Sequence, residues 1–155
     1  MHYRYNNVIT LRSFSKAYGL GGLRIGYGFA HHDLISNLMK VKVPFEPSIP
    51  AQVAGCAALE DLDFLEKTLT ANNNSLQYLQ SELNKLGVLF LPSAANFITT
   101  IWESEDEAIR IVNKLMEDGI IVRHLKSFGR PNYIRISTGL KEENKRLISQ
   151  LKSIL

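Results

Sequence analysis

The hydrophobic positions at the start of the chain fall into two short runs separated by a glycine cluster. Residues 8–14 and 23–30 are rich in β-branched and aromatic side chains, which predicts two strands separated by a glycine-rich turn. Residues 32–42 predict a short helix, and Pro50 suits the first turn of a second helix that ends near Leu59. This part of the chain is therefore expected to form two strands followed by two helices.

A leucine stripe follows between residues 62 and 86. Its leucines recur at alternating three- and four-residue steps, and Asn72 occupies the one missing step. Gly87 comes directly after the stripe and ends the helix. This spacing predicts one long helix whose leucine face packs against other elements, rather than a cofactor site. The leucines are Leu62, Leu65, Leu69, Leu76, Leu79, Leu83 and Leu86.

After Gly87 the pattern changes to short alternating units. Ser104 and Glu107 form a capping-box pattern, which opens a helix that Gly119 closes. The order β-β-α-β-β-α predicts a compact α+β unit. Its segments are strands at 88–91 and 96–102, a helix from 104, strands at 120–123 and 132–137, and a helix at 140–155.

Composition narrows the classes of protein that this chain can represent. Its 155 residues are enough for one domain, or for a modest domain with part of another. The net charge of +3 is a weak basis for a nucleic-acid or membrane partner, and residues 1–7 lack the apolar core of a signal peptide. Cys56 is the single cysteine, which excludes an internal disulfide and fits the reducing cytoplasm. His31, His32 and His124 have no metal-ligand spacing with Cys56, so we assign no metal.

Candidate chemistry is concentrated in residues 13–28. Lys16 lies among hydroxyls and glycines after a predicted strand, and an amine that attacks a carbonyl must be neutral, which burial near other cations favours. Ser13, Ser15 and Arg24 have the groups that hold a phosphate. Together they predict a site for a phosphorylated aldehyde. The alternative is an exposed lysine in an ordinary glycine turn, and residue types alone leave both open.

The run from Ser13 to Tyr27 resembles the Schiff-base motif of fold-type I pyridoxal-phosphate-dependent aminotransferases. The matching positions are Ser13, Ser15, Lys16, Leu20, Gly22, Leu23, Arg24, Ile25, Gly26 and Tyr27. Within that class II-like group, the rest of the chain is similar to the histidinol-phosphate aminotransferase family. The resemblance implies an α/β fold, a truncated fold-type I transferase: the end of the large parallel-sheet domain followed by the small α+β C-terminal domain.

The resemblance also implies roles for the residues of the motif. It implies that Lys16 binds pyridoxal 5'-phosphate covalently and then acts as the acid and base of the proton shift. It implies that Ser13 and Arg24 bind the cofactor phosphate, with Ser15 as an additional contact.

Two later arginines and one asparagine match the same family. Arg135 alternates with Ile134 and Ile136 and so faces away from them; the resemblance implies that it holds a substrate carboxylate. Arg123 matches the arginine that the histidinol-phosphate branch uses for the substrate phosphate. Since guanidinium suits both anions, one site can accept a phosphate in one half-reaction and a carboxylate in the other. The alternative for either arginine is a surface salt bridge.

Asn96 is expected to cap the strand entry by an Asx turn rather than to reach substrate.

Parts of the family's cofactor site have no counterpart in this chain. Fifteen residues precede Lys16, none of them an aspartate that could pair with the pyridinium nitrogen. The resemblance therefore implies a C-terminal portion: residues 1–60 end the large domain, residues 61–87 form a connecting helix and residues 88–155 form the small domain. We expect a fragment of a longer protein, or the product of a short reading frame, with little or no transaminase activity alone.

The leading hypothesis is a cytoplasmic transaminase of histidine biosynthesis that exchanges an amino group between histidinol phosphate and 2-oxoglutarate. The family implies a homodimer, and we expect no nucleic-acid or membrane partner. One alternative is another fold-type I enzyme, such as an aromatic or other amino-acid aminotransferase or a phosphothreonine decarboxylase-like enzyme. The other is a non-catalytic α+β module.

Overall fold

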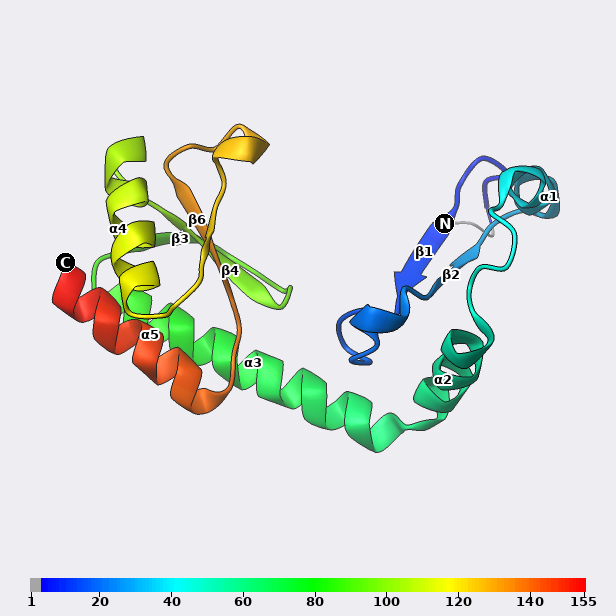
Figure 1. The fold of residues 1–155 in the computed structure, drawn as a ribbon, viewed down its shortest axis with the longest axis horizontal. Coiled ribbons are helices and arrows are strands. Elements are labelled where there is room, and N and C mark those ends of the chain that lie inside the picture. The colour runs from blue at the N-terminus through cyan, green and yellow to red at the C-terminus, as the bar shows by residue number, and fades with distance from the viewer. Residues whose placement is uncertain (1–3) are drawn as a thin grey trace. The chain divides into compact units, whose positions relative to one another are not determined.

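A computed structural model describes residues 4–155 (Figure 1). The chain forms two compact units, and the boundary along the sequence lies between Leu69 and Thr70. Each unit is described by itself. Among the described residues, no helix combines the length and the apolar composition that crossing a bilayer requires.

The first unit contains an antiparallel hairpin and two helices. Strand β1 pairs with β2 so that Ser13 lies opposite Gly26, and the short 3-10 helix η1 lies in the connection between them. The hydroxyl of Ser48 accepts a hydrogen bond from the amide of Ala51 and caps α2, which confirms the helix expected around Pro50. The elements are β1 Thr10–Ser13, η1 Gly21–Leu23, β2 Gly26–Phe29, α1 His32–Val41 and α2 Ile49–Glu60.

The second unit is a four-stranded antiparallel sheet covered by helices. Along the chain its elements follow the expected order β-β-α-β-β-α, which is confirmed. Within the sheet, the order of neighbouring strands is β3-β4-β6-β5. Its elements, with the long helix that leads into them, are α3 Leu62–Lys85, β3 Leu89–Leu91, β4 Phe97–Ile101, α4 Glu105–Glu117, β5 Arg123–His124, η2 Lys126–Phe128, β6 Tyr133–Ser137 and α5 Lys141–Ile154.

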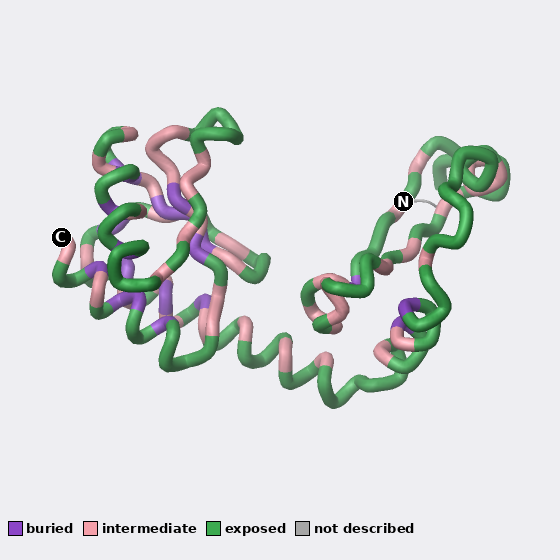
Figure 2. Tube along the Cα trace, in the orientation of Figure 1, coloured by how far each residue is buried: buried purple, intermediate pink, exposed green. Residues whose placement is uncertain are grey.

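The core of the second unit lies on one face of this sheet, between the strands and three helices (Figure 2). Alternate residues of β4 and β6 face the helices, because successive side chains of a strand point to opposite faces. The other face carries the remaining side chains of the strands. The core residues are Leu79, Leu83, Val88, Ile98, Trp102, Ala108, Ile111, Leu115, Ile134, Ile136, Leu147, Ile148 and Leu151.

The leucine stripe forms a single helix as expected, but it is buried over only part of its length. Leu76, Leu79 and Leu83 are buried, whereas Leu62 at the start of α3 is 67% exposed. Asn72, at the break in the stripe, donates a hydrogen bond to the carbonyl of Ala95 and accepts one from the hydroxyl of Thr138. The polar position therefore ties α3 to the turns that flank β4 and β6.

The strand expected at residues 120–123 is wrong in its extent. The amide of Ile120 donates to the carbonyl of Leu115 at 2.8 Å and so closes the end of α4, and Ile121 is 88% exposed. Pairing with β6 begins only at Arg123, so β5 has two residues. Apolar composition predicted a strand that starts at Ile120, but the amide of Ile120 is used to end α4 and only Arg123 and His124 pair with β6.

Candidate functional site

The predicted lysine motif forms a loop between β1 and β2. The amide of Phe14 donates to the carbonyl of Ile25, and the amide of Leu20 donates to the carbonyl of Phe14 at 3.0 Å. Phe14 is 3% exposed, and its ring lies 5.0 Å from that of Tyr18 and 5.3 Å from that of Tyr27. One buried aromatic side chain therefore holds both ends of the loop together.

Lys16 lies on this loop next to two hydroxyl groups. The amide of Ser15 donates to the hydroxyl of Ser13 at 3.0 Å, and the carbonyl of Lys16 accepts from the amide of Gly19 at 2.9 Å. The Lys16 side chain is exposed, and no ion pair of this amine occurs among residues 4–155. The backbone contacts order the turn and leave the amine available to a ligand.

Glycines permit the close backbone approaches within the loop. A Cβ at Gly26 would lie 2.7 Å from the carbonyl oxygen of Arg12, and one at Gly21 would lie 3.1 Å from the carbonyl oxygen of Ser15. Arg24 has a φ of 51°, an uncommon conformation for a residue with a side chain, and its guanidinium donates to the Gly21 carbonyl at 2.6 Å. This bond uses one of the five guanidinium N–H donors.

The two other predicted arginines lie side by side on the face of the sheet opposite the core. Arg123 of β5 is the register partner of Arg135 of β6, and Arg135 also lies opposite Thr99 of β4. Because Ile134 and Ile136 face the core, Arg135 and its partner face the other way. Like charges in direct opposition are unfavourable on a sheet, and an anion placed between them would remove this repulsion.

Arg135 has unused hydrogen-bonding capacity. Its Nε atom is buried and has no hydrogen-bond partner, and its guanidinium carbon lies 5.1 Å from the centre of the Phe97 ring. Among residues 4–155, neither Arg135 nor Arg123 has a carboxylate within 4.0 Å. The expected alternative, a surface salt bridge, is therefore not found for either arginine. A buried donor without an acceptor is costly, and a bound anion is one group that would supply the acceptor.

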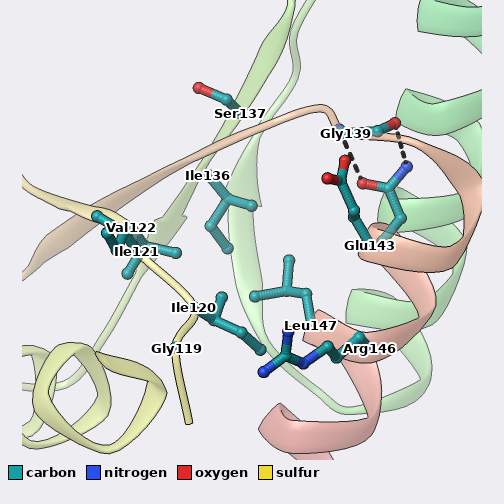
Figure 3. A pocket seen from close by; sticks show the side chains of 11 residues that line it. Gly119, Ile120, Ile121, Val122, Ile136, Ser137, Gly139, Glu143, Arg146 and Leu147 are labelled. Carbon is teal, nitrogen blue, oxygen red and sulfur yellow. Dashed lines mark hydrogen bonds between the residues drawn. The ribbon is translucent and has the colours of Figure 1, made fainter. Parts of the chain in front are cut away.

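A pocket of about 260 Å³ lies on the helical side of the sheet, where the chain before β5 diverges from β6 (Figure 3). Three of its four polar side chains are hydrogen-bonded within the chain, and the fourth, Ser137, is exposed. The carboxylate of Glu143 accepts from the amide of Leu140 at 2.6 Å, the Asn144 amide bonds both backbone groups of Gly139, and Arg146 donates to the carbonyl of Asp118. The pocket therefore offers little to orient a polar ligand.

The predicted site residues thus form two groups. The first group lies on the β1–β2 loop of the first unit and consists of Ser13, Ser15, Lys16 and Arg24. The second group, Arg123 and Arg135, lies on one sheet face of the second unit.

The turn expected of Asn96 is made by Ser93 instead. The hydroxyl of Ser93 accepts from the amide of Ala95 and donates to the carbonyl of Phe97 at 2.6 Å. A serine two residues before a backbone amide is a sequence signal for such a turn, and Ser93 has this spacing from Ala95.

A comparison with protein families decides the assignment. The model of the aminotransferase class I and II family matches residues 3–151. The chain belongs to this family. It has the α/β fold of the fold-type I aminotransferases, and the β1–β2 loop is the segment that carries the lysine of the motif.

Relatives of this aminotransferase chain include histidinol-phosphate aminotransferase 1 of Psychrobacter arcticus, 44% identical over 154 residues. The histidinol-phosphate aminotransferase of Campylobacter hominis is 42% identical over 152 residues. The match covers 97% of this chain and 40% of the first protein, and 98% of this chain and 41% of the second. The chain therefore spans about two fifths of the length of the relatives it matches.

A solved structure agrees with the sequence comparison. The histidinol-phosphate aminotransferase of Sinorhizobium meliloti, in complex with pyridoxal-5'-phosphate, superposes with a TM-score of 0.88 at 35% identity. The match covers 96% of this chain and 41% of that one.

Proposed function

We propose that this chain carries the cofactor lysine and the substrate-binding arginines of a pyridoxal-phosphate-dependent aminotransferase that acts on histidinol phosphate and 2-oxoglutarate. The observation that carries the proposal is the pair of directly opposed arginines, one with an unpartnered buried Nε, on a chain whose β1–β2 loop bears the motif lysine. The names of the two relatives, both histidinol-phosphate aminotransferases, support the amino donor in this proposal.

The residues of the β1–β2 loop fit pyridoxal phosphate. The cofactor has an aldehyde and a phosphate dianion, and the loop presents one exposed amine at Lys16 with hydroxyls at Ser13 and Ser15. Arg24 has further guanidinium donors beyond the one that bonds Gly21. Lys16 would hold the aldehyde carbon, and the hydroxyls and Arg24 would hold the phosphate. The cofactor supplies the electron-withdrawing ring that makes the substrate Cα–H acidic.

The amine of Lys16 then has a second task. As the acid and base of the proton shift, this amine would accept the proton from the amine-bearing carbon of the substrate and then donate it again to complete the transfer. The bond between the Lys16 carbonyl and the amide of Gly19 orders the backbone that carries this amine. A lysine on an ordered backbone keeps the proton transfer short.

The opposed arginines would hold the anionic end of either substrate. Arg135 would bind a carboxylate of 2-oxoglutarate through its planar fork, and Arg123 would bind the phosphate of histidinol phosphate. Both substrates present an anion to the same sheet face, so one site serves both half-reactions. Within this proposal, residues 1–60 end the large domain, residues 61–87 connect the domains and residues 88–155 form the small domain. The working protein is a cytoplasmic homodimer, for which the free thiol of Cys56 is compatible with a reducing compartment.

The lysine is tested by cofactor labelling. The chain is mixed with pyridoxal phosphate, reduced with borohydride and digested, and the labelled peptide is identified by mass spectrometry. The label is expected on Lys16, and the absorption band of the lysine-bound cofactor is expected to disappear in Lys16→Ala. Lys42→Ala, which removes another exposed lysine, is the control and should keep the band. Labels spread evenly over all lysines would contradict the proposal.

The substrates are tested in a chimera that joins this chain to the remaining three fifths of the Psychrobacter relative. Arg123→Ala should lower kcat/KM for histidinol phosphate by about tenfold or more, which is the effect of losing a charge-assisted hydrogen bond. The same variant should lower kcat/KM for glutamate by a smaller factor. Arg135→Lys should impair both substrates, because lysine lacks the bidentate fork. An equal loss for all amino donors in Arg123→Ala would exclude the phosphate role.

A further inference from the structure

A third arginine stands on the same sheet face as Arg123 and Arg135. Arg130 follows η2, and its guanidinium carbon lies 5.8 Å from the centre of the Tyr133 ring. Tyr133 is two residues before Arg135 on β6 and is the register partner of Ile101, so its ring lies on the face away from the core. The side chain of Arg130 is thus brought over the end of the strand that carries Arg135.

The backbone between η2 and β6 holds Arg130 in this position. Gly129 has a φ of +71°, which reverses the chain after η2. The amide of Arg130 donates to the carbonyl of Leu125 at 3.2 Å, and the amide of Tyr133 donates to the carbonyl of Arg130 at 3.2 Å. Two hydrogen bonds therefore fix the residue that carries the guanidinium.

All three guanidinium groups are held in the same way. Arg123 lies 5.3 Å from the centre of the Phe128 ring, and Arg130 and Arg135 also lie over rings. A cation over a ring face is stabilised without using its N–H donors. Among residues 4–155, Arg130 has no carboxylate within 4.0 Å either. This face therefore presents three positioned cations whose donors are directed to no acidic side chain of the described chain.

We propose that Arg130 is a specificity-determining residue that favours a phosphate monoester over a carboxylate at this face; this rests on the substrate proposed above. A phosphate monoester carries nearly two charges at neutral pH and three acceptor oxygens, whereas a carboxylate carries one charge and two oxygens. Arg123 and Arg135 are enough for a carboxylate. The third guanidinium matches the additional oxygen and charge of the phosphate.

The experiment compares two probes that share a ring and differ in the anion, phenyl phosphate and benzoate. Each is titrated into the 155-residue chain at low salt, and binding is followed through the backbone amide resonances of β5 and β6. Arg130→Ala should lower the affinity for phenyl phosphate by about fivefold to tenfold, as expected for one lost charge-assisted hydrogen bond. It should lower the affinity for benzoate by less than about twofold. Arg130→Lys, which keeps the charge, should recover part of the loss.

Lys141→Ala is the matched control, because it removes one positive charge at the start of α5, and it should leave both affinities unchanged. Equal losses for the two probes, no loss in Arg130→Ala, or no binding of phenyl phosphate by the unmodified chain would overturn the inference. Because the cofactor is absent from this measurement, failure of Lys16 labelling would count against the proposed function and leave the selectivity of this face measurable.

Discussion

Individual backbone contacts decide which residues the β1–β2 loop accepts. A Cβ at Gly26 would meet the carbonyl oxygen of Arg12 at 2.7 Å, and a backbone oxygen cannot move aside as a flexible side chain can. Gly22, three positions after Gly19 in the same loop, has no atom within 4 Å of the corresponding point. Two glycines of one motif therefore have different structural roles.

Gly26→Ala should destabilise the chain by about 1–3 kcal/mol, because it forces β1 and β2 apart next to Ser13. The free energy of unfolding is measured by urea titration. Gly22→Ala, the matched control, should change it by less than about 0.5 kcal/mol. Similar losses in both variants would show that the close approach at Gly26 is not the cause.

The opposed arginines are a second feature of the residue scale. Arg123→Gln should stabilise the chain by about 0.2–1 kcal/mol at low ionic strength, because it removes the repulsion from Arg135. Added phosphate should raise the Tm of the unmodified chain and have a smaller effect on the variant. Thermal unfolding with and without phosphate measures both effects. Arg110→Gln on α4 is the control and should respond to phosphate like the unmodified chain.

At the scale of the elements, the packing of α3 against α5 includes one acidic side chain between two lysines. The carboxylate of Glu82 lies 2.6 Å from the amine of Lys85 on its own helix and 3.3 Å from that of Lys152 on α5. Hydrogen bonds from Lys85 and then Lys152 hold the pKa of Glu82 below its usual value of 4.5. The ion pair therefore links the two helices only while Glu82 is charged.

Because folding lowers the pKa of Glu82, its contribution to stability is present above pH of about 4.5 and is lost as the pH falls through the lower value of the folded state. Glu82→Gln should be less stable than the unmodified chain at pH 7, and this gap should narrow steadily as the pH falls below about 4.5. Urea titrations across this pH range measure the difference. Glu66→Gln, on an exposed position of α3, should show no such dependence, and a Glu82→Gln gap that does not change with pH would contradict the ion-pair account.

At the scale of the whole molecule, the two units differ in how much apolar surface they bury. The second unit has a contiguous core that spans its sheet and three helices, whereas the buried apolar side chains among residues 4–69 of the first unit are Phe14 and Ala51. The first unit instead exposes large apolar side chains such as Phe45, at 97%. Fewer buried contacts imply easier local opening.

Amide hydrogen exchange should therefore be faster in the first unit than in β4, β6 and α5. Leu151→Ala removes a fully buried side chain of the second core and should cost about 2–5 kcal/mol, with faster exchange confined to the second unit. Val53→Ala, an exposed position on α2, should change neither unit. Uniform exchange across the chain would contradict a division into two units of different stability.

Local sequence alone predicted most elements, and it gave the hypothesis for the residues around Lys16. Periodicity is a local property, so the leucine stripe, the capping serine at position 104 and the alternation around Arg135 were readable from their neighbours. The motif at Lys16 is likewise contiguous, which is why its residues meet on one loop.

Tertiary structure decided which distant residues share a surface. The register that sets Arg123 opposite Arg135 depends on the pairing of β5 with β6, and the pairing of β6 with β4 sets the face on which Tyr133, the ring beneath Arg130, lies. A shift of one residue in that pairing would move each side chain to the other face, and no local pattern encodes the partner. The sequence determined which side chains this protein carries for chemistry, and strand pairing determined that Arg123 and Arg135 share one face of the sheet.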